Sequence, residues 1–116
     1  MPPVLAMAEQ QLDSGNAQAA LGICNQFLNV ATGYPAALVM KARALMALGR
    51  GAEAGPLLDQ AMQKDQSGRT LAAMAEYQAT VKKDVAKAKA EYQKAIAADP
   101  AYARQAGLKK KLAALK

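Results

Sequence analysis

The side chains that most often carry enzyme chemistry are scarce in this sequence. It contains one cysteine, Cys24, and no histidine, so the commonest general base and metal ligand in proteins is absent. The carboxylates are scattered over predicted turns and outer helix faces, and Gly49-Arg50-Gly51 lacks the spacing of a phosphate-binding loop. We therefore expect no catalytic residue, no metal site and no cofactor, and predict that the chain is not an enzyme.

Positive charge is concentrated in the last third of the chain. Residues 1–81 hold five Lys/Arg and six Asp/Glu, whereas residues 82–116 hold ten and three, a net charge of +7. Such a basic region could bind a polyanion or an anionic membrane surface. No aromatic residue interleaves with the lysines of its densest part, which disfavours nucleic acid, and a solvated helix face is the preferred interpretation. This basic patch consists of Lys109, Lys110, Lys111 and Lys116.

The elements that must position these residues are predicted to be helices. Apolar residues make up 53% of the chain but aromatic residues only 4%, which indicates a core of Ala, Leu and Met. No β-branched run suggests a strand. No segment has the length and hydrophobicity of a membrane span or the pattern of a signal peptide, so the compartment is undetermined, and the segment could be a piece of a longer protein.

One helical pattern recurs along the chain. Residues 83–100 predict a short loop and an amphipathic helix that Pro100 terminates, because proline lacks the amide needed to continue it. The same pattern lies 34 and 68 residues earlier, and a fixed period of this size is typical of a repeat array. Cys24 falls on the buried face, which favours a core residue over a reactive thiol. The buried positions are Ala20, Cys24 and Phe27, then Ala54, Leu58 and Ala61, then Ala88, Tyr92 and Ala95.

Seven helices are expected in all. The third is apolar on almost every side, so it must be covered on both sides or offer one side to a partner. The seventh resembles an end cap with one apolar face. The predicted ranges are 2–14, 17–30, 36–48, 52–64 and 70–82, a sixth helix within 83–100, and a seventh over 102–116.

The fifth helix has two possible registers. If the 34-residue period is kept without a shift, Glu76 takes a core-facing position, and burial of an unpaired charge costs several kcal/mol. We therefore favour a shift of one residue, which leaves Arg69, Ala73, Glu76 and Thr80 exposed. This register buries Leu71, Met74, Ala75, Gln78 and Val81.

Helix pairs at a 34-residue period resemble the tetratricopeptide repeat family, whose second helices carry alanine, a bulky residue and alanine; Ala54, Leu58 and Ala61 and Ala88, Tyr92 and Ala95 match in full, and the first repeat matches through Ala20 and Cys24. Gly15 and Gly49 match the glycine between the paired helices, and Lys83 departs from it. The first helices match less well: Val4, Met7, Ala8 and Gln11 stand where the family prefers tryptophan, leucine, glycine and tyrosine. The resemblance implies an all-α, right-handed superhelical solenoid in a single domain, with repeats at about 2–34, 35–67 and 68–101 and a capping helix at 102–116.

The resemblance also implies a concave groove, lined by the first helix of each pair, that holds a peptide or helix of a partner. A clamp for a C-terminal carboxylate is not expected, because apolar and acidic residues occupy its places. Arg43, flanked by Glu9 and Glu76, could orient a peptide or form an internal salt bridge. The expected groove residues are Leu5, Glu9, Leu12, Val39, Met40, Arg43, Met46, Ala73, Glu76 and Thr80.

We therefore predict a protein-interaction adaptor or scaffold. Two alternatives are self-assembly through the apolar third helix or the capping helix, and polyanion binding through the basic last third. By analogy with the family, the alanine-rich composition suggests a bacterial protein, cytoplasmic or periplasmic, that serves in secretion, pilus or envelope assembly.

Overall fold

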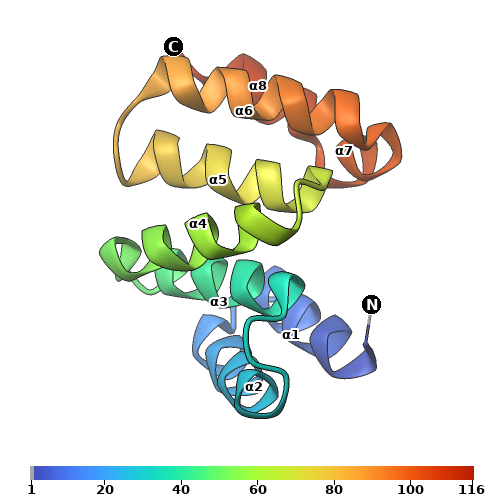
Figure 1. Ribbon diagram of the computed structural model, residues 1–116. Coiled ribbons are helices and arrows are strands. Elements are labelled where there is room, and N and C mark those ends of the chain that lie inside the picture. Colours follow the sequence, from blue (N-terminus) through green and yellow to red (C-terminus); the bar gives the residue numbers. More distant parts are fainter. Residues whose placement is uncertain (1) are drawn as a thin grey trace. The chain divides into compact units, whose positions relative to one another are not determined.

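The computed structural model describes residues 2–116, which form eight α-helices, one short 3₁₀-helix and no strand. The predicted all-α fold of helix pairs is therefore confirmed (Figure 1). The chain divides into two compact units, Met1–Lys64 and Asp65–Lys116. The single-domain organisation and the handedness of the superhelix stay predictions.

The first unit contains two helix pairs, and consecutive helices pack against each other. Pro3 and Pro35 begin α1 and α3, where a missing amide proton costs nothing. Pro56 lies within the first turn of α4, where its missing amide proton is not needed, and a 3₁₀ turn precedes the helix, so α4 starts two residues later than predicted. The elements are α1 (Pro3–Asp13), α2 (Ala17–Val30), α3 (Pro35–Ala47), η1 (Gly51–Glu53) and α4 (Ala54–Lys64).

The apolar third helix is covered by its neighbours. It packs against α1, α2 and α4, and most of its side chains are buried. The structure thus removes the reason to expect an exposed apolar side of this helix for self-assembly. Its buried residues are Ala37, Leu38, Val39, Met40, Ala42, Ala44 and Leu45.

The face of α1 that packs inward includes Leu5, which was expected to line the groove. Leu5 and Ala8 are buried, whereas Val4 and Met7, which stand where the family prefers tryptophan and leucine, are 46% and 56% exposed. Leu5, Ala8 and Leu12 form an unbroken apolar row at helical spacing, while Gln11 interrupts the alternative row. The more continuous apolar face takes the core.

The second unit contains one helix pair and two shorter helices. α5 packs against α6, and α6 also contacts α7 and α8. Asp84 and Asp99 cap α6 and α7, since each carboxylate accepts a hydrogen bond from the backbone amide three residues on. The helices are α5 (Gly68–Thr80), α6 (Val85–Ala98), α7 (Pro100–Ala106) and α8 (Leu108–Ala114).

The single capping helix predicted for residues 102–116 is wrong. Gly107 adopts the left-handed conformation, with φ of 66°, and breaks the segment into α7 and α8. Pro100 ends α6 and also begins α7. Leu108 is buried and Leu112 and Leu115 are half-buried, so the apolar side of α8 faces its own unit in part.

The fifth helix follows the shifted register only in part. Leu71, Met74 and Ala75 are buried and Glu76 is not, as that register predicts. Ala73, however, is buried although it was expected to be exposed, and Ala72 is buried as well. Small side chains allow close approach from more than one side, so α5 has no broad exposed face. Gln78 and Val81, expected in the core, are half-buried.

The repeated pattern on the second helices is confirmed. The alanines at its first position and the cysteine, leucine and tyrosine at its next position all lie in the core, although they belong to different helix pairs. Only Phe27 is half-buried among the nine positions. The buried members are Ala20, Cys24, Ala54, Leu58, Ala61, Ala88, Tyr92 and Ala95.

Candidate protein-binding surface

Four of the ten expected groove residues are core residues instead. Leu5 and Met40 belong to one apolar cluster with Cys24, and Val39 and Ala73 are also buried. The expected groove face of α1 is its packing face, and α3 is covered on most sides, so these side chains cannot contact a ligand in this conformation. This part of the sequence-based site is corrected.

The exposed part of the expected surface is organised around Arg43. Its guanidinium lies 3.9 Å from a carboxylate oxygen of Glu9 and 3.9 Å from one of Asp13. Both distances exceed a hydrogen bond, so the attraction is between charges and is not directional. The Arg43 side chain remains 25% exposed.

Asp13 was missed by the sequence analysis. The signal was available, since Asp13 is four residues after Glu9 and two residues at that spacing share one face of a helix. Together they place negative charge on both sides of one cation from the neighbouring helix. The arrangement joins α1 and α3, the first helices of two successive pairs.

Apolar side chains accompany these charges. Leu12 lies three residues after Glu9 and Met46 three residues after Arg43, and both are half-buried. Leu12 also packs against both core clusters of the first unit. We call this surface the α1–α3 strip; it consists of Glu9, Leu12, Asp13, Arg43 and Met46.

A shallow hollow of about 550 Å³ adjoins the strip. It lies between the α1–α2 turn and the end of α3, and Leu12 and Leu48 are among its lining residues. The turn residues Gly15 and Asn16 line it too. The sequence analysis did not anticipate this hollow, because it forms only where the turn and α3 meet.

The remaining expected groove residues belong to the second unit. Glu76 is half-buried and Thr80 is exposed, and the Thr80 hydroxyl donates a hydrogen bond of 2.7 Å to the Glu76 carbonyl. Burial, with the negative charge of Glu76, raises the pKa of Tyr92 to about 12. That Glu76 and Thr80 continue the α1–α3 strip stays a prediction.

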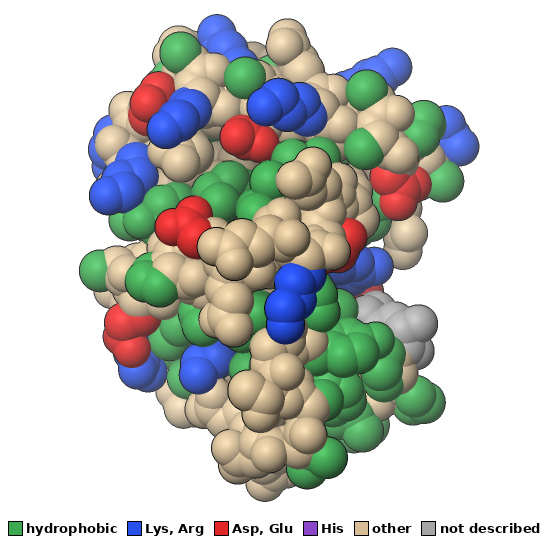
Figure 2. All heavy atoms as spheres, in the orientation of Figure 1, with side chains coloured by type: hydrophobic (Ala, Val, Ile, Leu, Met, Phe, Trp, Pro, Cys, Tyr) green, Lys and Arg blue, Asp and Glu red, His purple; other side chains and the backbone are tan. Residues whose placement is uncertain are grey.

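The basic patch is exposed as expected. Lys109, Lys110 and Lys111 lie on α8, and Lys116 follows that helix. Figure 2 shows most of the lysine and arginine side chains of the visible face over the unit formed by α5–α8. The patch is therefore available to anions in this conformation.

The described residues contain no group of three or more side chains arranged to hold a metal ion. Cys24 is buried, and burial raises the pKa of its thiol to about 11, against a weaker opposing effect of Lys41. A neutral buried thiol is a poor nucleophile. Within residues 2–116, no helix is both long enough and apolar enough to cross a bilayer.

Consecutive pairs of antiparallel helices, repeated along the chain, define a helical-repeat fold. A sequence model of the tetratricopeptide repeat matches residues 11–77, and the chain belongs to the tetratricopeptide repeat family. Such repeats generally mediate protein–protein interactions and are typically non-catalytic. No curated protein and no solved structure matches the chain significantly.

Proposed function

We propose that the chain is a protein-interaction adaptor that binds a partner segment along the α1–α3 strip. The observation that carries this proposal is the position of Arg43, partly exposed and held between the carboxylates of Glu9 and Asp13. A partner can contact both signs of charge there, with apolar contacts beside them.

The strip offers the mixture expected of a binding surface. Met46 is flexible and polarizable, so it can adapt to more than one apolar side chain. Arg43 can form a bidentate hydrogen-bond pair with a partner carboxylate. Leu5 of α1 and Met40 of α3 are buried in one apolar cluster that holds the two helices together. The strip is therefore already ordered, and a partner that binds it loses little affinity to the entropy cost of ordering the strip.

The proposal is tested by site-specific cross-linking. A photoreactive benzoyl-phenylalanine replaces Met46, and the purified protein is irradiated in lysate of its native source. The control carries the same group at Val30, which lies on α2 and is 90% exposed. We expect a discrete adduct from position 46 and none of that size from position 30.

The captured segment is then synthesised and titrated against the wild type and Arg43→Gln. We expect at least a tenfold loss of affinity in the variant, because the charge-assisted hydrogen bonds are removed. Equal adducts from positions 46 and 30, or equal affinities for wild type and variant, would contradict the proposal.

A further inference from the structure

A second candidate site lies in the other unit, away from the α1–α3 strip. A pocket of about 440 Å³ opens between α6, α7 and α8, a volume within the range of ligand pockets in proteins. Its apolar lining comes from Ile96, Pro100 and Ala103. Its charged lining includes Arg104 and Lys109.

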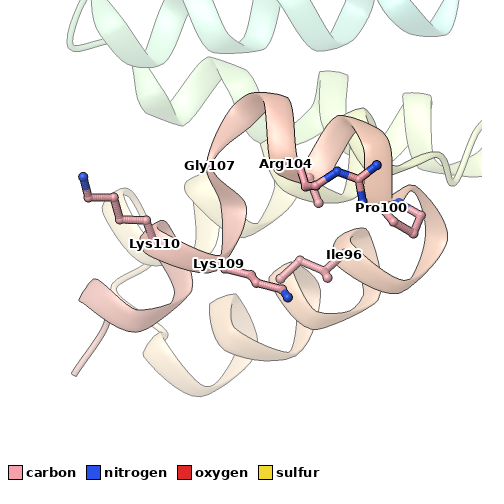
Figure 3. A pocket seen from close by; sticks show the side chains of 7 residues that line it. Ile96, Pro100, Arg104, Gly107, Lys109 and Lys110 are labelled. Carbon is pink, nitrogen blue, oxygen red and sulfur yellow. The ribbon is translucent and has the colours of Figure 1, made fainter.

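The break at Gly107 creates this pocket. Because its backbone is left-handed, α8 turns back from α7 instead of continuing it. Figure 3 shows the Lys109 side chain extending toward Ile96, and the Arg104 side chain on the Pro100 side of the pocket. A continuous helix over residues 102–116 would not bring these side chains together.

The electrostatics of the pocket are one-sided. Among the residues of this pocket that the structure describes are three cations and no carboxylate, and residues 82–116 carry a net charge of +7. Lys110, the third cation, extends away from the pocket (Figure 3). Arg104 and Lys109 are therefore the groups placed to meet a ligand's negative charge.

We propose that this pocket binds an acidic segment of a partner protein, with one bulky apolar side chain held against Ile96 and Ala103. Carboxylates flanking that side chain would pair with Arg104 and Lys109. An apolar anchor surrounded by charged contacts is the usual anatomy of a protein interface. Nucleic acid is disfavoured, because none of the described residues that line the pocket has an aromatic side chain on which a base could stack. The inference shares with the proposed function only the premise that the ligand is protein.

The test uses a fluorescein-labelled peptide of six acidic residues around one central phenylalanine, and a second peptide with serine at the centre. Fluorescence anisotropy measures binding to the full chain. The variant is Lys109→Glu, and the matched control is Lys111→Glu, which makes the same charge change on the same exposed helix but does not line the pocket.

We expect the wild type to bind the phenylalanine peptide at least tenfold more tightly than the serine peptide. Lys109→Glu should weaken that binding at least tenfold, and Lys111→Glu less than threefold. Equal effects of the two substitutions, or equal affinity for the two peptides, would show attraction by overall charge alone and overturn the proposal.

Two further arms separate other outcomes. In the first arm, vesicles of phosphatidylcholine and phosphatidylserine replace the peptide. If Lys109→Glu reduces binding to the vesicles but not to the peptide, the pocket binds a membrane surface and the proposal is wrong. Arg43→Gln is added in the second; if it weakens peptide binding while Lys109→Glu does not, the peptide lies on the α1–α3 strip and the pocket proposal is wrong. A failure at the α8 pocket is thereby distinguished from a failure at the α1–α3 strip.

Discussion

Gly49 and Lys83 occupy the same place in successive repeats, 34 residues apart, and both adopt a left-handed backbone, with φ of 77° and 59°. Gly15, a further 34 residues earlier, does the same with φ of 84°. Lys83 is the only non-glycine residue with positive φ in the described part of the chain. The repeat geometry therefore imposes this conformation even where the sequence lacks glycine.

Replacing Lys83 with glycine should stabilise the protein. A left-handed residue with a Cβ costs about 1–2 kcal/mol, and the greater freedom of glycine in the unfolded chain offsets part of the gain. We expect the free energy of unfolding to rise by about 0.5–1 kcal/mol, measured by urea denaturation.

Gly49→Ala is the matched control for that substitution. It introduces a Cβ at a left-handed position with no heavy atom within 4 Å of it, so any loss comes from the backbone alone. We expect a loss of about 1 kcal/mol. A Lys83→Gly variant no more stable than the wild type would show that position 83 is not strained in solution.

The two methionines expected to line the groove should differ in how much a charged substitution destabilises the protein. Met40 is fully buried in the first unit, so Met40→Glu should cost about 3–5 kcal/mol, the penalty of an uncompensated buried charge. Met46 is half-buried, and Met46→Glu should remain folded. Thermal unfolding followed by circular dichroism separates the two; a similar melting temperature for both would contradict the placement of Met40 in the core.

Alkaline pH should destabilise the fold through Cys24. The unfolded chain releases the thiol proton near its ordinary pKa of 9.0, whereas burial raises the folded pKa to about 11. Between these values the unfolded state binds fewer protons, so stability falls as pH rises, by at most about 1.4 kcal/mol per pH unit. Below pH 9 this contribution is constant.

The measurement is urea denaturation of wild type and Cys24→Ala from pH 8 to pH 11. The variant should lose the decline that begins near pH 9. It should retain the decline above pH 10 from Tyr92, whose pKa burial raises from 10.0 to about 12. Parallel curves for the two proteins between pH 9 and 10 would exclude the thiol as the cause.

Two glycines within helices should respond oppositely to alanine. Gly22 is exposed on α2, and a Cβ added there would meet no heavy atom within 4 Å, so Gly22→Ala should stabilise by about 1 kcal/mol through helix propensity. At Gly68 a Cβ would lie 2.7 Å from the Cβ of Asp99 and 3.2 Å from the Ala95 carbonyl oxygen. Gly68→Ala should therefore destabilise by about 1–3 kcal/mol.

Chemical denaturation of the two alanine variants checks this contrast. Both positions are helical, so propensity alone would predict stabilisation of both. Stabilisation by Gly68→Ala would mean that the start of α5 and the end of α6 are farther apart than the structure places them.

Local sequence determined the helices and much of the core. Apolar residues at helical spacing, with proline at helix starts and glycine between paired helices, predicted α2 with its observed bounds. The 34-residue period predicted the buried positions of the second helices. These features depend on interactions within one or two turns of helix, which the sequence displays directly.

Tertiary structure decided which residues remain at the surface. Leu5 and Met40 are residue types that a binding surface could carry, but both are in the core. Leu5 is buried because the most continuous apolar row of α1 packs inward, and Met40 is buried because neighbouring helices cover α3. The pairing of Asp13 with Arg43 likewise depends on the contact between α1 and α3, and the pocket beside Gly107 depends on how α6, α7 and α8 pack together. Helical periodicity places a residue on a face, and only packing determines whether that face is covered.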